Sequence, residues 1–321
     1  MRDDDQLVLA LGMRLWGQCG QVMSWEHLGA DARGHDRTVA ALSCLQEMGF
    51  DVRLAPSGVR LVPPEDTPCS HELLRGLGVP TVCSPVVGST STVAGLLAKA
   101  GAPHGTIVLA EAQLHGRGRH GSPWFSPAGE GIWCSVVLRP GSPLPHPGLV
   151  SLLAGLCVLR VLRRAGAEAV VLKWANDVMW RRKKACGVLV DRVPHPDGES
   201  YVAGIGINVH QSEERFPQGI RAKSASVDMI LKRSANRAEL LASLARDLLE
   251  AWAKEEPEGL TSTPGEWNAE SGTVGMMVRV GADSELLTGT VEGVGDDGAL
   301  ILRLVDGTRR MFVSGHVELM E

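Results

Sequence analysis

Residues 116–127 read GRGRHGSPWFSP, and this glycine-rich, basic stretch decides which folds the chain can adopt. Extended apolar segments precede it (TIVLAEAQ, 106–113) and follow it (GIWCSVVLRP, 131–140), so we expect a loop between two strands. Its glycines have the GxGxxG spacing of dinucleotide-binding folds, but that fingerprint requires a helix directly after the turn. Ser-Pro-Trp follows instead, and the sequence contains no GxxxxGK(S/T) phosphate loop. Both of these nucleotide-binding folds are therefore excluded.

The loop has the composition of an anion-binding segment. Arg117 and Arg119 carry permanently charged, planar guanidinium groups that suit a phosphate or a carboxylate. Gly116 and Gly118 allow backbone N–H groups to come close to a ligand. A disordered surface loop is the alternative, but Trp124 and the phenylalanine after it are side chains that are usually buried. The sequence predicts capture of an anion by a mobile basic loop.

A second polar segment, GSTST at 88–92, lies between a predicted strand (81–87) and a predicted helix. Ser89 and Ser91 are of the residue type that caps helices. A helix N-terminus also presents free N–H groups to an anion. Capping alone and ligand binding are both consistent with the sequence at this point.

Beyond the loop, a predicted hairpin carries further polar residues. VVLKWANDVMW (170–180) and ACGVLVDRV (185–193) read as strands, and RRKK (181–184) forms the turn between them. A run of basic residues at a turn is usually a solvated tip, but an Asn-Asp pair within a strand is unfavourable without a specific reason. YVAGIGINV (201–209) is a largely apolar strand whose glycines permit close approach of another group.

The first 66 residues read as helices followed by a β-hairpin, the layout of a winged helix-turn-helix. They contain six basic and ten acidic side chains. Because neutralisation of phosphates supplies most DNA affinity, this charge balance argues against strong DNA binding. DNA binding and a retained or regulatory role both stay open for this unit.

From Gly275 onward the sequence consists of short strands joined by Asp-Gly turns, which predicts a small barrel of the SH3 type. The predicted fold class is therefore α+β. We expect a winged helix-turn-helix-like domain at 1–66, a central domain with a mixed sheet at 67–264, and an SH3-like domain at 265–321.

The composition is that of an ordinary globular protein, with 44% apolar residues, 21% charged residues and a net charge of −5. This charge indicates no general preference for nucleic acid or membrane, and the longest apolar run is too short to span a bilayer. The acidic start MRDDDQ lacks the order of a signal peptide. Seven cysteines, none in a CxxC pair, favour reduced cytoplasmic thiols over a disulfide framework or a zinc site.

Five strings occur in register along the chain: GSTST, GRGRHGSPWFSP, KWANDV, KKACGVLVD and GIGINV. Together with the flanking domains they resemble the family of bifunctional biotin–protein ligases that double as biotin-operon repressors. The resemblance implies that biotin and MgATP form biotinyl-5′-adenylate, and that biotin then passes to a lysine of a biotin carboxyl carrier domain. Such chemistry requires fixed cations and backbone donors around two anions rather than a protein nucleophile. No Ser-His-Asp or Cys-His pattern is visible.

The resemblance also assigns roles to residues by their place in these motifs. The catalytic group is Arg117, Arg119, Asp177 and Lys184. The groups that bind biotin are Ser89, Thr90, Gln113, Gly116, Arg117, Gly118, Lys184 and Gly187. The groups that bind ATP or the adenylate are Arg119, Trp124, Asn176, Gly206 and Asn208. For Asp177 three tasks stay open: orienting the acceptor lysine, deprotonating it, or holding Mg²⁺.

Three positions depart from the usual family pattern: Ser91 in place of Asn, His120 in place of a third basic residue, and Ala175 in place of Pro. His120 would make the loop charge sensitive to pH near about 6.5, the pKa of a free histidine. The resemblance further implies a ligand-dependent homodimer and a DNA operator as candidate partners. Two alternatives remain, a lipoate or octanoate transferase of related fold and a DNA-binding biotin sensor with weak catalysis.

Overall fold

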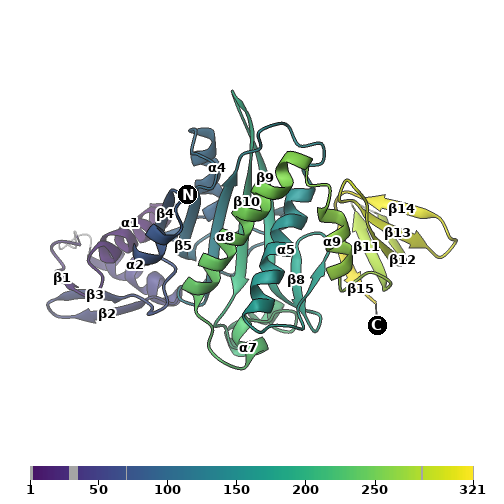
Figure 1. The fold of residues 1–321 in the computed structure, drawn as a ribbon. Coiled ribbons are helices and arrows are strands. Elements are labelled where there is room, and N and C mark those ends of the chain that lie inside the picture. Colours follow the sequence, from purple (N-terminus) through teal and green to yellow (C-terminus); the bar gives the residue numbers. More distant parts are fainter. Residues whose placement is uncertain (1–2, 29–34, 70, 283–284, 321) are drawn as a thin grey trace.

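Three β-sheets follow one another along the molecule (Figure 1). The computed structural model describes residues 3–28, 35–69, 71–282 and 285–320. A small N-terminal sheet, a large central sheet and a C-terminal sheet appear in Figure 1 from purple to yellow. The predicted α+β class is confirmed for the described residues. None of the helices in these ranges is long and apolar enough to cross a membrane.

The N-terminal unit has the predicted order of helices and then a hairpin. The helix at its centre ends shortly before Gly49, which has a φ of 98°, a conformation that favours glycine. The segment from 29 to 34, between β1 and α2, lies outside the described residues. The elements of this unit are α1 (Asp3–Gly17), β1 (Val22–Met23), α2 (His35–Glu47), β2 (Asp51–Ala55) and β3 (Gly58–Val62).

The central sheet has seven strands in the order β4-β5-β6-β10-β9-β8-β7. Strands β4 and β5 are parallel, and every other neighbouring pair is antiparallel, so the sheet is mixed as predicted. The basic loop joins β5 to β6, as the sequence indicated. The strands are β4 (Thr81–Val87), β5 (Ile107–Gln113), β6 (Gly131–Leu138), β7 (Val171–Lys173), β8 (Asp177–Trp180), β9 (Lys183–His195) and β10 (Gly198–Asn208).

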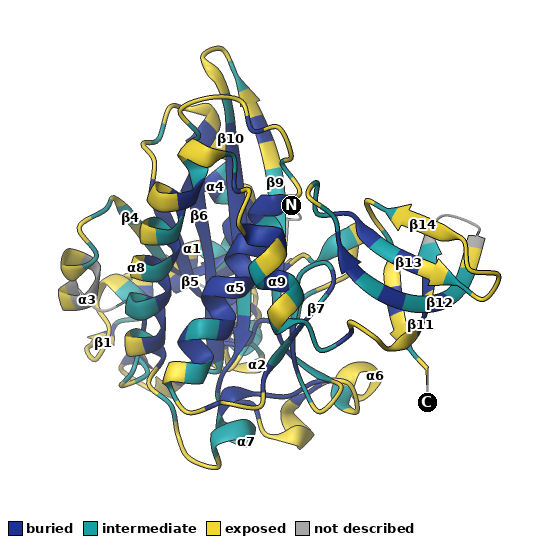
Figure 2. Cartoon of the chain, turned by 45° about the vertical axis from the view of Figure 1, so that its right-hand side comes forward, coloured by how far each residue is buried: buried dark blue, intermediate teal, exposed yellow. Residues whose placement is uncertain are grey.

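Helices cover the two faces of this sheet unequally. Alternate residues of β6, such as Ile132 and Cys134, join the main core with α5 (Leu149–Arg164) and α8 (Arg237–Glu255). Val137, on the opposite face, packs with the shorter α4 (Thr90–Lys99). Figure 2 shows α5 as the most deeply buried helix. The α4 face is left only partly covered by helix, and a cavity lies there.

Shorter elements complete the chain. Each lies in a connection between the strands and long helices. They are α3 (His71–Gly76), η1 (Arg119–Gly121), η2 (Glu213–Arg215), α6 (Gln218–Arg221), α7 (Val227–Leu231), η3 (Glu256–Glu258) and α9 (Thr263–Glu270).

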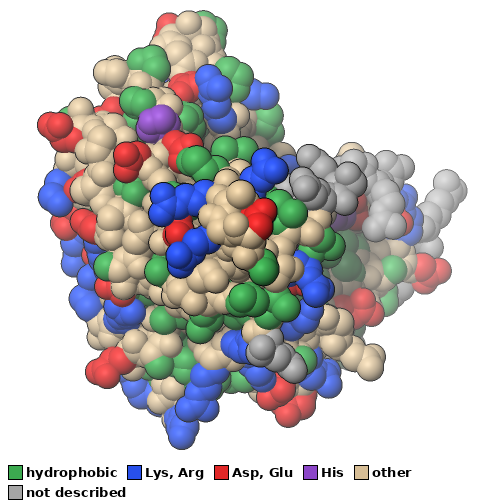
Figure 3. Space-filling view, turned by 90° about the vertical axis from the view of Figure 1, so that its right-hand side faces the viewer, with side chains coloured by type: hydrophobic (Ala, Val, Ile, Leu, Met, Phe, Trp, Pro, Cys, Tyr) green, Lys and Arg blue, Asp and Glu red, His purple; other side chains and the backbone are tan. Residues whose placement is uncertain are grey.

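The C-terminal sheet is antiparallel, with strands in the order β14-β13-β12-β11-β15. Hydrogen bonds from several segments join it to the rest of the chain: Trp174 Nε1 donates to Gly298 O at 3.0 Å, Asn268 bonds both backbone groups of Val294, and Arg182 donates to Leu319 O and Met320 O. Figure 3 looks onto this end of the molecule, where hydrophobic and charged side chains are interspersed. The strands are β11 (Met277–Ala282), β12 (Glu285–Val294), β13 (Leu300–Leu304), β14 (Arg309–Phe312) and β15 (His316–Leu319).

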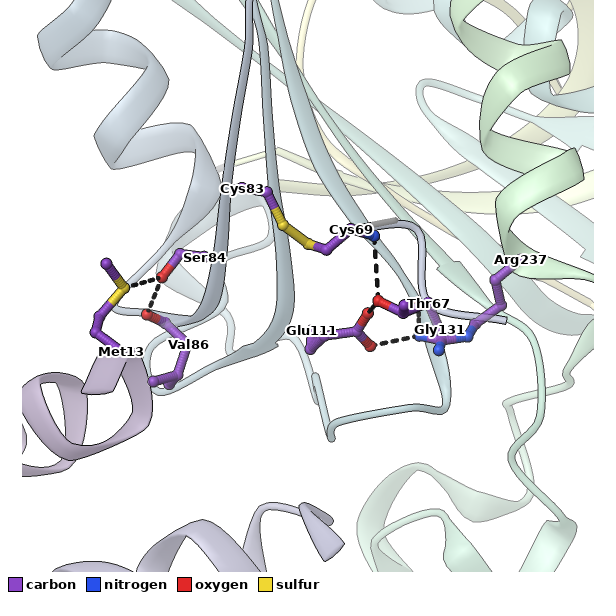
Figure 4. The surroundings of a disulfide bond; sticks show 9 residues. All are labelled: Met13, Thr67, Cys69, Cys83, Ser84, Val86, Glu111, Gly131 and Arg237. Carbon is purple, nitrogen blue, oxygen red and sulfur yellow. Dashed lines mark hydrogen bonds and ion pairs between the residues drawn. A yellow bond between two sulfur atoms is a disulfide. The ribbon is translucent and has the colours of Figure 1, made fainter. Parts of the chain in front are cut away.

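Cys69 and Cys83 form a disulfide (Figure 4), which corrects the expectation that the cysteines are all reduced thiols. Cys69 lies in the linker after the N-terminal unit, and Cys83 lies in the edge strand β4. The two cysteines meet because the linker folds back along this edge, which no local sequence pattern reveals. Cys134, Cys157 and Cys186 are buried free thiols, and burial raises the pKa of each.

A buried ionic network fixes the same linker to the central sheet. Arg237, at the start of α8, lies 2.8 Å from Glu111 and 2.9 Å from Asp66, and its side chain is fully buried. Asp66 also contacts His210 at 2.8 Å. Thr67 donates a hydrogen bond to Glu111 (Figure 4). Separating one member from this network would leave a buried charge unpaired, which is strongly destabilising. The network therefore holds the linker in one position on the central sheet.

Candidate functional site

A cavity of about 930 Å³ lies on the α4 face of the central sheet, between the basic loop, the β8–β9 hairpin and the C-terminal sheet. It collects residues that are distant in sequence, from position 89 to position 319. With the exception of Gly116, every residue singled out from the sequence as a site residue lines it. These are Ser89, Thr90, Gln113, Arg117, Gly118, Arg119, Trp124, Asn176, Asp177, Lys184, Gly187, Gly206 and Asn208.

One end of the cavity holds a set of neutral polar side chains. The backbone N–H of Thr90 donates to Gln113 Oε1 at 2.9 Å, and the Gln113 amide donates to Ser126 at 2.8 Å. Ser89 occupies the N-cap position of α4, but its hydroxyl makes no capping hydrogen bond. Ser91 bonds Ser135 instead of the backbone. The expected capping role is therefore not observed, and the Ser89 hydroxyl is not occupied by the helix.

The basic loop folds back on itself as a short hairpin. Trp124 N–H donates to Gly116 O at 2.8 Å, and Gly118 N–H donates to Ser122 O at 2.7 Å. A Cβ on Gly116 would lie 2.5 Å from the Trp124 carbonyl oxygen, so this position requires glycine. Gly116 thus shapes the loop without lining the cavity. The Gly118 N–H is already bonded within the loop, so it does not serve here as the free anion donor that the sequence suggested.

The two arginines of the loop have different environments. Arg117 lies 3.3 Å from Asp191 at the cavity edge. The Arg119 guanidinium lies over the Trp174 ring, 5.6 Å from its centroid, and burial lowers the Arg119 pKa. No carboxylate of the described residues lies within ion-pair distance of Arg119. Arg119 is therefore a partly desolvated cation that is available to an anionic ligand.

Lys184 and Asp177 form an ion pair in the middle of the cavity. Their charged atoms are 2.6 Å apart, and the Lys184 ammonium lies 5.0 Å from the centre of the Trp124 ring. The β8–β9 pairing shifts register between Val178 and Met179. Such a bulge re-aims side chains next to functional sites. Backbone bonds from Lys184 to the segment 223–225 fix β9 at this point.

The basic run at the β8–β9 turn is more than the solvated tip that its sequence suggested. Arg181 stacks on Trp180 at 4.7 Å, and Lys183 pairs with Glu213 at 3.2 Å. Arg182 donates to backbone carbonyls at the end of the C-terminal sheet. Each basic side chain of this turn thus has its own partner, so Lys183 and Lys184 are not interchangeable.

Two glycines make room for the Trp124 ring. A Cβ on Gly206 would lie 2.4 Å from the indole nitrogen, and one on Gly187 would lie 3.0 Å from the ring. Trp124 Nε1 is buried and has no hydrogen-bond partner among the described residues. Asn208, by contrast, donates to Ala225 O at 3.1 Å. The indole nitrogen is therefore enclosed beside Gly206 without a partner, and the Asn208 amide nitrogen is already bonded.

Sequence reasoning missed part of the cavity wall. Lys173, in β7, lines the cavity, and burial lowers its pKa. Lys223 and His316 line it as well, and His316 comes from the C-terminal sheet. Lys173 stands in the KWANDV string and could have been found there. Lys223 and His316 lie in segments without a motif, so the sequence offered no signal for them.

A cluster of three or more His, Cys, Asp or Glu side chains that could hold a metal ion is absent from the described residues. Asp177 is the one carboxylate among the predicted site residues. Its Oδ1 is buried, touches Lys184, and makes no hydrogen bond of good geometry. A single carboxylate together with substrate phosphates is a usual way to bind Mg²⁺.

Two family models match this chain. Residues 83–208 match the biotin/lipoate A/B protein ligase family, and residues 273–320 match the biotin protein ligase C terminal domain. The chain is 30% identical over 311 residues to the bifunctional ligase/repressor BirA of Escherichia coli, with 94% of each chain covered. It is 33% identical over 270 residues to the biotin–[acetyl-CoA-carboxylase] ligase of Mycobacterium tuberculosis, covering 79% of this chain and 95% of the relative.

A solved structure agrees with these relatives. The biotin protein ligase from Aquifex aeolicus in complex with biotin and ATP superimposes with a TM-score of 0.65 at 27% sequence identity. The match covers 75% of this chain and 99% of the Aquifex chain.

Proposed function

Because this chain belongs to the biotin protein ligase family, we propose that it is an ATP-dependent biotin–protein ligase. It forms biotinyl-5′-adenylate from biotin and ATP and transfers biotin to a lysine of a carrier domain. The observation that carries this proposal is the pair Lys184–Asp177, 2.6 Å apart, with the available cation Arg119 in the same cavity. Neutral polar groups lie at one end of this cavity and an aromatic face lies in its wall.

In the first reaction a biotin carboxylate oxygen attacks the α-phosphorus of ATP, and pyrophosphate leaves. Both reactants are anions, so the protein must hold them together and stabilise charge at phosphorus. Lys184 bridges the carboxylate and the phosphate, and Arg119 contacts the phosphate. Arg117, at the cavity edge, helps to retain the adenylate. No protein nucleophile is required.

We assign the neutral end of the cavity to the biotin ring system. Ser89 carries the hydroxyl that α4 leaves unused, and Gln113 is oriented by Thr90 and Ser126. A few such polar groups orient a ligand in an otherwise apolar pocket. Gly187 and Gly118 line the cavity and allow the rest of the ligand to lie close to the backbone, while Gly116 shapes the loop that covers it.

The nucleotide is assigned to the side of Trp124. The Trp124 ring lines the cavity and packs near the adenine. Gly206 keeps space for this ring, and Asn208 and Asn176 present their remaining amide oxygen atoms. ATP and biotin lie in a solved relative, the Aquifex aeolicus enzyme, which supports both substrates for this chain.

Transfer forms an amide bond between the acceptor lysine and biotin and releases AMP and a proton. Asp177 is placed to orient the incoming amine or to accept this proton. Asp177 is also the residue that would hold Mg²⁺, which would supply charge neutralisation at the phosphates. The mixed anhydride hydrolyses in water, so the basic loop must cover it until the amine arrives.

The test combines the pure protein with biotin, MgATP and a biotin carboxyl carrier domain and probes the carrier with streptavidin. We expect a labelled carrier that depends on both biotin and ATP. An unlabelled carrier would contradict the proposal. Replacing biotin with lipoate or octanoate tests the transferase alternative, and we expect no transfer of either acid.

A repressor role is a second proposed function, supported by relatives that are named bifunctional ligase/repressor. We propose that residues 1–66 form a winged helix-turn-helix domain, 67–264 the catalytic domain and 265–321 an SH3-like barrel; the three separate sheets support this division. A ligand-dependent homodimer would then bind an operator.

A gel shift on DNA upstream of biotin genes, with and without biotin and ATP, tests the repressor role. A protein–DNA complex that forms only when both ligands are present supports this role. The absence of such a complex contradicts it.

A further inference from the structure

We propose that Arg182 is a positioning residue for the ATP end of this site, because it fastens the turn that carries Lys184 to the C-terminal sheet. A single Arg182 nitrogen, Nη2, donates to Leu319 O at 3.0 Å and to Met320 O at 3.1 Å. Both acceptors lie at the end of β15, and the segment 315–319 forms one wall of the cavity. This inference rests on the proposed ligase reaction and adds a residue to it.

The backbone of the turn is held in an unfavourable conformation. Arg181 and Arg182 have φ values of 47° and 66°, in the left-handed region that suits Gly and Asn rather than a long side chain. Strained backbone of this kind persists where surrounding contacts determine it, and it is concentrated at functional sites. Arg182 contacts two carbonyl oxygens of another sheet, whereas Arg181 stacks on Trp180 within its own hairpin, so the contact that ties this turn to the cavity wall is that of Arg182.

Arg182 is not needed to attach the C-terminal sheet as a whole. Trp174, which precedes β8, bonds Gly298, and Asn268, which lies in α9, bonds Val294. Arg182 instead fixes one edge of the sheet, the edge that faces the cavity. Lys184 follows Arg182 by two residues and lines the cavity. A movement of this sheet edge would therefore reach Lys184 through the backbone of the turn.

The affected end of the cavity is the one that collects cations. Lys173 and Lys223 line the cavity with Lys184, and the neighbouring wall that Arg182 holds carries His316 and Glu318. Burial and the nearby Lys173 lower the His316 pKa, so the lysines supply the positive charge. Ser89 and Gln113 lie at the β4–β5 edge of the sheet, whereas β7 and β8 form the opposite edge. Loosening the Arg182 contact should therefore disturb the polyphosphate of ATP and leave biotin binding almost unchanged.

The test compares Arg182→Ala and Arg182→Lys with Arg181→Ala, a matched control that removes the same charge from the same turn. We measure ATP and biotin affinity by calorimetry, and KM and kcat by biotin-dependent ATP–pyrophosphate exchange. For Arg182→Ala we expect ATP affinity to fall about tenfold, the scale of one lost hydrogen bond to a charged group, and biotin affinity to stay within twofold. Arg182→Lys should recover part of the loss, and Arg181→Ala should resemble the wild type.

Equal losses in Arg181→Ala and Arg182→Ala would show that net charge alone matters and would overturn the inference. Loss of biotin and ATP affinity together, or wild-type behaviour of Arg182→Ala, would also overturn it. If Arg182→Ala does not fold, Arg182→Lys still decides, because it keeps the charge and loses the geometry. A wild-type protein that binds ATP without exchange would contradict the ligase proposal, while the calorimetric comparison would still test Arg182.

Discussion

Lys184 and Lys183 are neighbours in the chain, but they have different partners. Lys184 contacts Asp177 and Trp124 inside the cavity, whereas Lys183 pairs with Glu213. We expect Lys184→Ala to lower the rate of adenylate formation roughly 100- to 1,000-fold, the range for removing one charge-stabilising donor. Lys183→Ala should remain close to wild type. Rapid-quench measurement of biotinyl-5′-adenylate gives both rates, and equal losses would contradict the assignment.

Much of this site could be predicted from the sequence, because its charged residues occur in compact motifs. Arg119, Asp177 and Lys184 fall in three separate strings, and the structure brings them to one cavity. Gly116 shows a limit of such reasoning. Its motif suggested a contact with the ligand, but the structure requires glycine at this position because the loop turns tightly beside Trp124. His316 could not be predicted, since its place depends on how a separate sheet docks.

The pairing of loop and strand β10 gives a second test. Gly206 lies beneath the Trp124 indole, so Gly206→Ala must displace the ring or strain the backbone. Overpacking of this kind costs about 1–3 kcal/mol, and we expect weaker adenylate binding. Gly219→Ala is the control, because a Cβ at Gly219 would meet no atom within 4 Å. Adenylate dissociation rates decide the point, and equal rates for both variants would contradict the proposed packing.

The linker network predicts a pH dependence of stability. Burial disfavours the charged His210, but hydrogen bonds to Asp66 and Asp228 outweigh this and raise the His210 pKa. Its stabilisation is therefore complete below about pH 6.5, the unfolded value, and is lost as the pH rises through the folded pKa. For Asp66 burial opposes ionisation, but bonds to His210 and Arg237 lower its pKa, so its contribution is lost only in acid.

We test this with urea unfolding of the wild type and His210→Gln between about pH 6 and pH 9. The wild type should lose stability over this range relative to the variant, because only the wild type releases a proton from position 210. The difference between the two proteins removes the effect of the other histidines. Parallel curves would show that folding does not shift the His210 pKa and would contradict this prediction.

The long elements were predictable for a simple reason: their apolar periodicity is local. The helix at 149–164 and the strands at 107–113 and 201–208 show it directly. The order of the seven strands and the return of the linker along β4 depend on contacts between distant segments. Periodicity carries no record of such contacts, so these features came only from the structure.

For the molecule as a whole, the disulfide Cys69–Cys83 ties the linker of the N-terminal unit to the catalytic sheet. A closed loop of this length stabilises a protein by about 3 kcal/mol. We expect a reductant to lower the free energy of unfolding by about this amount, and Cys69→Ser with Cys83→Ser to do the same without reductant. Reductant should then have no further effect on the double variant. An unchanged wild type in reductant would contradict the stabilising role.

The ligase assignment is tested most directly by biotin-dependent exchange of labelled pyrophosphate into ATP, which needs no carrier domain. The wild type should incorporate label only when biotin is present, and Lys184→Ala and Arg119→Ala should both incorporate less. Exchange that does not need biotin, or none at all with correctly folded protein, would contradict the account.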